Sequence, residues 1–243
     1  MLAKDVSAPT YDFLLGQPGA LDRKDALLAC VAATAADGSA RATREILIYA
    51  LQRGLTAGML REALLEIAPL AGAVRAEQAL AALAEATVEA EKPTDPFSSL
   101  LEPRERKVAP ASATGIDDDA PAGPSALDAV HGERAARLRA RLADRSKALA
   151  RWLDEDLYGR VFARPGLTPL QRALVALGAV FPLESRDSTA DWVHAARSGG
   201  ASAAALWMLA DTLARLFRES PEIKVALSGF ESILGRRVRP LED

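Results

Sequence analysis

The sequence contains one cysteine, Cys30, and two histidines, His131 and His194, among 243 residues. A single cysteine excludes an intramolecular disulfide and any zinc or iron–sulfur site built from several cysteines. Two histidines are too few for a histidine-rich metal centre. We therefore expect no metal ion and no cofactor.

Long hydrophobic runs are also absent. No apolar run approaches the roughly 20 residues that span a bilayer, and the opening residues, MLAKDVSAPTYDF, lack the apolar core of a signal peptide. The net charge of −3 provides no overall attraction to nucleic acid or to a membrane surface. These features predict a cytoplasmic protein that binds neither of these partners.

Aromatic residues make up only 5% of the chain, whereas 49% of its residues are apolar, with alanine and leucine dominant. Alanine and leucine favour helices, and the scarcity of β-branched and aromatic residues argues against a sheet. The composition predicts an all-α fold. Asp22, Thr56, Thr168 and Ser202 are expected N-caps. Pro69 is expected to end a helix, and residues 133–158 are expected to form one long helix.

The chain divides on composition into three parts. Residues 91–124 hold six of the fourteen prolines and a run of three aspartates, a pattern typical of a linker. The flanking segments, residues 1–90 and 125–243, are helical in pattern and similar to each other. At a constant offset of 146, leucines, a helix-ending glycine and two caps coincide, including Gly54 with Gly200 and Thr56 with Ser202. We interpret them as two tandem helical modules related by a pseudo-twofold repeat.

Three segments resemble a known family. The stretch WLDEDLYGRVFARPGLTPLQRALVAL, residues 152–177, is similar to the entry to the second module of tandem carboxymuconolactone decarboxylase-like proteins, relatives of the alkylhydroperoxidase AhpD. Residues 130–132, VHG, resemble the "VYG" that opens the preceding helix, and GLTAGMLREALLEIAPLAGAVRAEQALAAL, residues 54–83, resembles the first module. The resemblance implies an AhpD-like helical fold that assembles into rings, commonly trimers or hexamers of the module.

The family's peroxidase chemistry uses a glutamate, a CxxC pair and a histidine, and the resemblance implies where each would fall here. In both modules every one of these positions is occupied by a different residue type. The glutamate is replaced by Leu27 and Ala173. The two cysteines are replaced by Ser39 and Ala42 in the first module and by Ser185 and Ser188 in the second, and the histidine is replaced by Ile46 and Trp192.

These replacements remove the chemistry that the family requires. Dithiol peroxidases need a thiolate of low pKa and a resolving thiol, and a serine hydroxyl is far less acidic than a thiol. We therefore expect no thiol peroxidase activity. Decarboxylase-type relatives lack the CxxC pair but keep the histidine, so its replacement also argues against their activity. Cys30, within an apolar helix, is expected to be a buried structural residue.

Some polar residues near the ancestral site are weak catalytic candidates. Arg172 could anchor an anion, and Asp187 and Asp191, four residues apart on one helix face, could supply an acid and base. Trp192 and Tyr158 would line such a pocket. His194 is expected at a surface or interface, and His131 is expected to be structural. The basic residues between Arg134 and Arg151 are read as a solvated face or a subunit contact rather than a nucleic-acid site.

Two functions from different classes remain open. The favoured one is a catalytically degenerate family member that serves as an oligomeric scaffold or small-molecule-binding protein. The alternative is a lyase or decarboxylase-type enzyme that acts on a small organic acid or lactone through a rebuilt pocket near Arg172, Asp187 and Trp192. In either case we expect a homo-oligomer, such as a trimer-type ring, and a small organic acid as the candidate ligand.

Overall fold

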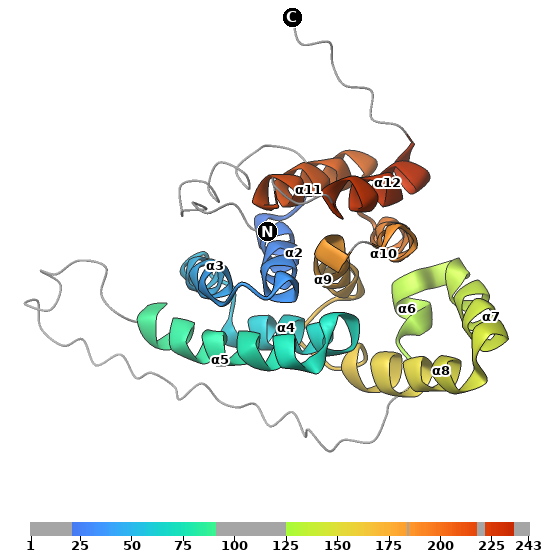
Figure 1. Ribbon diagram of the computed structural model, residues 1–243, viewed down its shortest axis with the longest axis horizontal. Coiled ribbons are helices and arrows are strands. Elements are labelled where there is room, and N and C mark those ends of the chain that lie inside the picture. Colours follow the sequence, from blue (N-terminus) through green and yellow to red (C-terminus); the bar gives the residue numbers. More distant parts are fainter. Residues whose placement is uncertain (1–20, 91–124, 184, 218–221, 236–243) are drawn as a thin grey trace, which may run out of the picture.

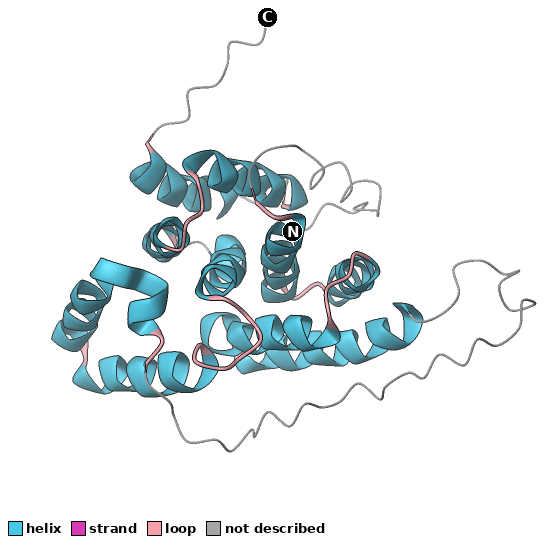
Figure 2. Cartoon of the chain, turned by 180° about the vertical axis from the view of Figure 1, so that it is seen from behind, coloured by secondary structure: helices cyan, strands magenta, loops and turns pink. Residues whose placement is uncertain are grey.

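Helices account for all the regular secondary structure in the computed structural model over the residues that it describes, 21–90, 125–183, 185–217 and 222–235. Figure 2 shows these helices joined by short loops. The predicted all-α fold is therefore confirmed. The expected linker, residues 91–124, lies outside the described residues.

Two helices at the centre of the molecule, α2 (Arg23–Asp37) and α9 (Pro169–Val180), pack directly against each other, and the remaining helices surround them (Figure 1). Ten consecutive residues of α2, Leu27 to Ala36, are buried. The two helices approach so closely that a Cβ atom at Gly178 would stand 2.1 Å from the carbonyl oxygen of Ala29. A helix buried on all sides must be apolar all round, which explains the run of alanine and leucine.

The first half of the chain continues with α3 (Ala40–Gln52), α4 (Ala57–Ala71) and α5 (Ala73–Ala90). Asp22 and Thr56 cap α2 and α4 as predicted, with their side chains accepting hydrogen bonds from Lys24 N and Met59 N. The expected break at Pro69 is wrong, because α4 includes this proline and ends at Ala71, with Gly72 as its C-cap. Pro69 falls in the last turn, where the helix is about to end.

The second half begins with a run of short helical segments: α6 (Leu127–His131), η2 (Gly132–Arg134), α7 (Ala135–Arg145), α8 (Lys147–Trp152) and η3 (Leu153–Val161). The single helix expected over residues 133–158 is therefore wrong. Ser146 takes an extended conformation, φ −163° and ψ 116°, and its side chain caps α8 by accepting from Leu149 N. Serine competes for backbone hydrogen bonds in this way, so it can start a new helix within a helical pattern.

The segment η3 is a π-helix, in which the Phe162 amide donates to the Leu157 carbonyl oxygen five residues earlier. Leu138 and Leu153 pack against the core, whereas Leu149 and Trp152 are 42% and 46% exposed. The break at Ser146 thus rotates α8 relative to α7.

The remaining helices are η4 (Phe181–Leu183), α10 (Arg186–Ser198), α11 (Ala203–Leu216) and α12 (Glu222–Leu234). Thr168 and Ser202 cap α9 and α11 as predicted, and Pro169 occupies the first position of α9. The helices α3 and α10 begin and end 146 residues apart, and α4 and α11 begin 146 residues apart. In the described part of the chain, no helix is both long and apolar enough to cross a membrane.

Candidate functional site

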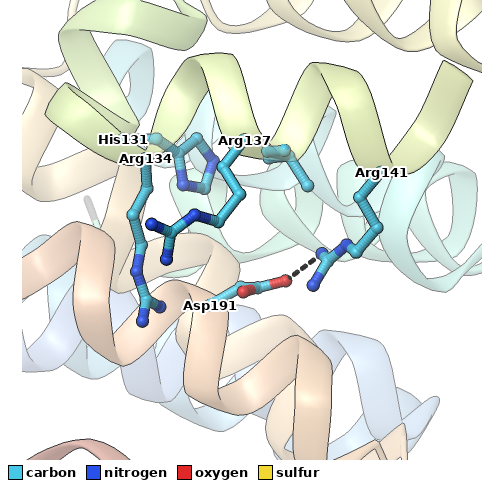
Figure 3. A pocket seen from close by; sticks show the side chains of 6 residues that line it. His131, Arg134, Arg137, Arg141 and Asp191 are labelled. Atoms are coloured by element: carbon cyan, nitrogen blue, oxygen red, sulfur yellow. Dashed lines mark hydrogen bonds and ion pairs between the residues drawn. The ribbon is translucent and has the colours of Figure 1, made fainter.

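A half-open pocket of about 150 Å³ lies between α10 and the segment that joins α6 to α7 (Figure 3). Its lining consists of His131 at the end of α6, four residues of η2 and α7, and Asp191 on α10: His131, Arg134, Arg137, Leu138, Arg141 and Asp191. Four of these six lining residues are charged at neutral pH: three arginines and one aspartate. This pocket is therefore the candidate functional site.

Three arginines project from one helix face over this pocket, because positions 134, 137 and 141 are spaced by three and four residues. Arg141 forms an ion pair with Asp191, with 2.5 Å between Nη2 and Oδ2. Arg134 and Arg137 form neither a hydrogen bond nor an ion pair with any residue that the structure describes. The basic run read from the sequence as a solvated face thus contributes three of its members to a pocket wall.

His131 forms the floor of the pocket and is 3% exposed. Its Nε2 lies 2.8 Å from the Tyr158 hydroxyl, which the π-helix places against it. Burial lowers the pKa of His131 to about 4, with Asp191 opposing that shift, so the imidazole is neutral near pH 7. Burial also raises the pKa of the Tyr158 hydroxyl, so the pair is uncharged.

Trp192 lies behind His131 and is 5% exposed. Its ring stands 4.8 Å from the His131 ring and stacks on Phe162 at 5.5 Å, both measured between centroids. Trp192 and Tyr158, expected to line a pocket, instead form the packed layer beneath it. Trp192 therefore fills space rather than bordering solvent.

A comparison with known families matches residues 9–85 to the carboxymuconolactone decarboxylase family. Residues 9–85, about a third of the chain, are therefore similar to this family. The resemblance drawn from residues 54–83 is thereby confirmed, and the all-α architecture agrees with it. No curated protein matches the chain. The pocket lies outside the matched residues.

The residues placed at the family's cysteine and histidine positions in the second half lie together at the start of α10. Ser185 caps this helix, accepting from Ser188 N at 3.2 Å, and its Oγ donates to Ser188 Oγ at 2.7 Å. Trp192 follows one turn later on the same helix. The two hydroxyls are thus close together, but their hydrogen bonds are made to each other and to the Ser188 backbone amide in the first turn of α10.

The corresponding positions in the carboxymuconolactone decarboxylase family region of the first half are less polar. Ser39 precedes α3 without a side-chain capping bond, and Ala42 lies in its first turn. Ile46 is fully buried, as are Leu27 and, in the second half, Ala173 at the family's glutamate position. A small recess of about 10 Å³ lies near these first-half positions. No described side chain there can transfer a proton from the family's positions.

Arg172 was a candidate anion anchor, but the structure buries it at 2% exposure. Its guanidinium contacts the buried carboxylate of Glu66 on α4 and also donates to the Arg164 carbonyl oxygen. Glu62 joins this cluster by accepting two hydrogen bonds from the Arg164 guanidinium, one at each carboxylate oxygen. An anion anchor needs an accessible guanidinium, so Arg172 cannot serve as one here. Instead it joins α9 to α4.

Burial raises the pKa of Glu66 to about 8, with Arg172 opposing that shift, and its second carboxylate oxygen has no hydrogen-bond partner. Asp187, the other candidate acid or base, is exposed and does not line the pocket, whereas Asp191 does. His194 is partly exposed beside Ser198. Of the three candidates Arg172, Asp187 and Asp191, the structure brings only Asp191 to the pocket.

Cys30 is buried in the middle of α2, as predicted, and burial raises the pKa of its thiol to about 12. A thiol with this pKa is almost entirely protonated at neutral pH and is a poor nucleophile. His131, in contrast, was undervalued by sequence reasoning. The signal available was its place in the VHG segment, where relatives carry a tyrosine, but nothing local indicated that α10 packs beside it.

Proposed function

We propose that this protein is a carboxymuconolactone decarboxylase-like protein without thiol peroxidase activity that acts as a small-molecule-binding protein within a homo-oligomeric scaffold. The observation that carries the proposal is the replacement at the start of α10. Two mutually bonded hydroxyls, Ser185 and Ser188, occupy the dithiol positions, and the buried Trp192 ring occupies the histidine position. The protein's one thiol, Cys30, lies in the core.

The proposal includes duplication of the module in residues 125–243. Two facts support it: matched helix ends and matched turn geometry. The N-caps Ser39 and Ser185 are 146 residues apart, as are the glycines that follow α3 and α10, Gly54 and Gly200, which have φ angles of 84° and 104°. Because both glycines have positive φ, a residue with a side chain at either position would strain the backbone. One chain would then imitate a dimer of single-module relatives.

Self-association is supported by apolar side chains that remain exposed on the described part of the chain. Apolar residues of α4 such as Leu60 and Ile67 are fully buried within the chain and need no partner. Val74 and Val88 on α5, and Trp152 on α8, are instead 65%, 64% and 46% exposed. Light scattering at micromolar concentration should report a mass above 25.7 kDa, and a monomer at every concentration would contradict this part of the proposal.

The lyase alternative receives less support. It needs Arg172 and Asp187 at a pocket with Trp192, but Arg172 is engaged by Glu66, Asp187 is exposed on α10, and Trp192 is buried beneath the pocket floor. A pocket with convergent polar groups does exist. However, burial makes His131 a weak base, and Asp191 is ion-paired with Arg141, so the pocket is better suited to binding than to proton transfer.

A peroxidase assay tests the proposal directly. Purified protein supplied with a dithiol and an alkyl hydroperoxide should consume no more hydroperoxide than the Cys30→Ser variant. A variant carrying Ser185→Cys, Ser188→Cys and Trp192→His restores the family's thiols and histidine in the second half and serves as the comparison. Turnover by the natural protein above the Cys30→Ser control would overturn the proposal.

A further inference from the structure

The charge of the pocket wall is unbalanced. Its lining includes three arginines and one carboxylate, Asp191, so the surplus is two positive charges. His131 adds none, because burial keeps its imidazole neutral near pH 7. A surplus of this size in a half-open cavity attracts anions, since the low-dielectric walls weaken screening by solvent.

The arginines are also arranged to converge. Figure 3 shows the side chains of Arg134, Arg137 and Arg141 descending from the α6–α7 segment toward α10, where Asp191 meets Arg141. Guanidinium groups bind carboxylate and phosphate through paired N–H donors in fixed geometry. Two of the three, Arg134 and Arg137, have no polar partner in the described part of the chain. Their donors are therefore available to a ligand.

The size of the pocket limits what can occupy it. A volume of about 150 Å³ is well below the ~300–1,000 Å³ of pockets for drug-sized ligands. Leu138 gives the wall one apolar side chain. The group that enters the pocket is thus small.

From this geometry we infer that the pocket binds a small dianion, a dicarboxylate or a phosphate group, through Arg134, Arg137 and Arg141, in competition with Asp191 for the Arg141 guanidinium. The inference rests on the proposed binding function and names its ligand class. Asp191 acts as a built-in counterion: it holds Arg141 over α10 when the pocket holds solvent, and it weakens binding by occupying one of the three arginines.

The chain's two histidines provide the readout, because the ring signals of His131 and His194 are the only histidine signals in the NMR spectrum. His131 lies in the pocket lining and His194 does not, and the His194→Gln variant assigns the two. Inorganic phosphate, succinate and acetate are titrated separately at constant ionic strength. Phosphate or succinate should shift the His131 signal in the millimolar range or below, and acetate should shift it far less.

Three substitutions then separate the site from general electrostatics. Arg137→Gln should weaken binding of the dianion about tenfold, the usual effect of losing a hydrogen bond to a charged group. Arg145→Gln removes the same charge from the end of α7, outside the pocket, and should change affinity less than twofold. Asp191→Asn should strengthen binding, because the competing carboxylate is removed.

Binding of phosphate alone or of succinate alone supports the inference and identifies the acidic group. The inference is overturned if neither dianion shifts the His131 signal, if acetate binds as tightly as succinate, if Arg137→Gln and Arg145→Gln have equal effects, or if Asp191→Asn weakens binding. Each of these results leaves the absence of peroxidase activity untouched. Conversely, peroxide turnover would overturn the proposed function without affecting the anion site.

Discussion

Gln171 donates a hydrogen bond from Nε2 to Asp25 Oδ1 at 2.8 Å, and the two residues are 146 positions apart. That separation is also the offset between α3 and α10. When two related halves pack about a twofold axis, residues at equivalent positions meet each other on the axis. The contact therefore marks where a pseudo-twofold axis would pass, between the central helices α2 and α9.

Gln171→Glu tests this contact without disturbing the end of α9. The Gln171 side chain also completes a capping box, in which Oε1 accepts from Thr168 N, and a glutamate keeps that acceptor. The new carboxylate would face Asp25, whose pKa burial already raises. We expect a loss of about 1–3 kcal/mol of unfolding free energy at neutral pH, measured by urea denaturation, and a smaller loss near pH 4. An equal loss at both pH values would contradict the assigned contact.

Gly178→Ala tests the close approach of α2 and α9. The added methyl carbon would stand 2.1 Å from the Ala29 carbonyl oxygen, so the two central helices must separate. We expect a destabilisation of at least about 1–3 kcal/mol. Gly58→Ala in α4 is the matched control, because its nearest contact would be an ordinary 3.8 Å. It should be neutral or should stabilise the protein by up to about 1 kcal/mol through helix propensity. Similar effects at both sites would refute the close packing.

Features that depend on neighbouring residues, such as helix caps, were predictable from the sequence, whereas contacts between distant segments were not. Asp22 and Thr168 were identified as caps because a cap depends on residues within one turn. The break at Ser146 was missed because a serine within a helical pattern can point to solvent or can start a new helix. The same limit applied to Arg172: its partner Glu66 lies 106 residues earlier, so nothing beside it in sequence indicated a buried ion pair.

The pocket shows this limit most clearly. Family spacing led to α10 and to Asp191, which does line the pocket. His131 and the arginines after it come from a segment 50 or more residues earlier that packs against α10. Only the tertiary structure shows that a basic helix face and a buried histidine lie beside Asp191 on α10.

His131 should make stability depend on pH. Its pKa is about 4 in the folded protein against 6.5 in an exposed histidine. As the pH falls from 6.5 to 4, His131 binds a proton in the unfolded chain but not in the folded protein, so the free energy of unfolding declines. The shift corresponds to about 3 kcal/mol at most. The stability advantage of the natural protein over His131→Gln should therefore shrink across this range, as followed by chemical denaturation at each pH.

Glu66 contributes in the opposite sense, because its raised folded pKa lowers stability as the pH rises from about 4.5 to about 8. That contribution is common to the natural protein and to His131→Gln, so it cancels in the difference. His194→Gln is the control, since the His194 side chain is only partly buried. A difference curve for His131→Gln that is flat between pH 4 and 6.5 would show that His131 is not buried as a neutral side chain.

Trp192 provides a sharp test of the proposal that its ring occupies the family's histidine position. Its ring is packed between His131 and Phe162, so truncation to alanine should leave a cavity and cost about 3–5 kcal/mol. A domain is often stable by only about 5–15 kcal/mol, so Trp192→Ala should lower the melting temperature by many degrees. Trp152→Ala is the matched control, because that ring is 46% exposed and its loss should move the transition far less. If Trp192→Ala melts within about one degree of the natural protein, Trp192 borders an open substrate pocket and does not fill the space proposed for the family's histidine. That result would support the lyase alternative and contradict the binding proposal.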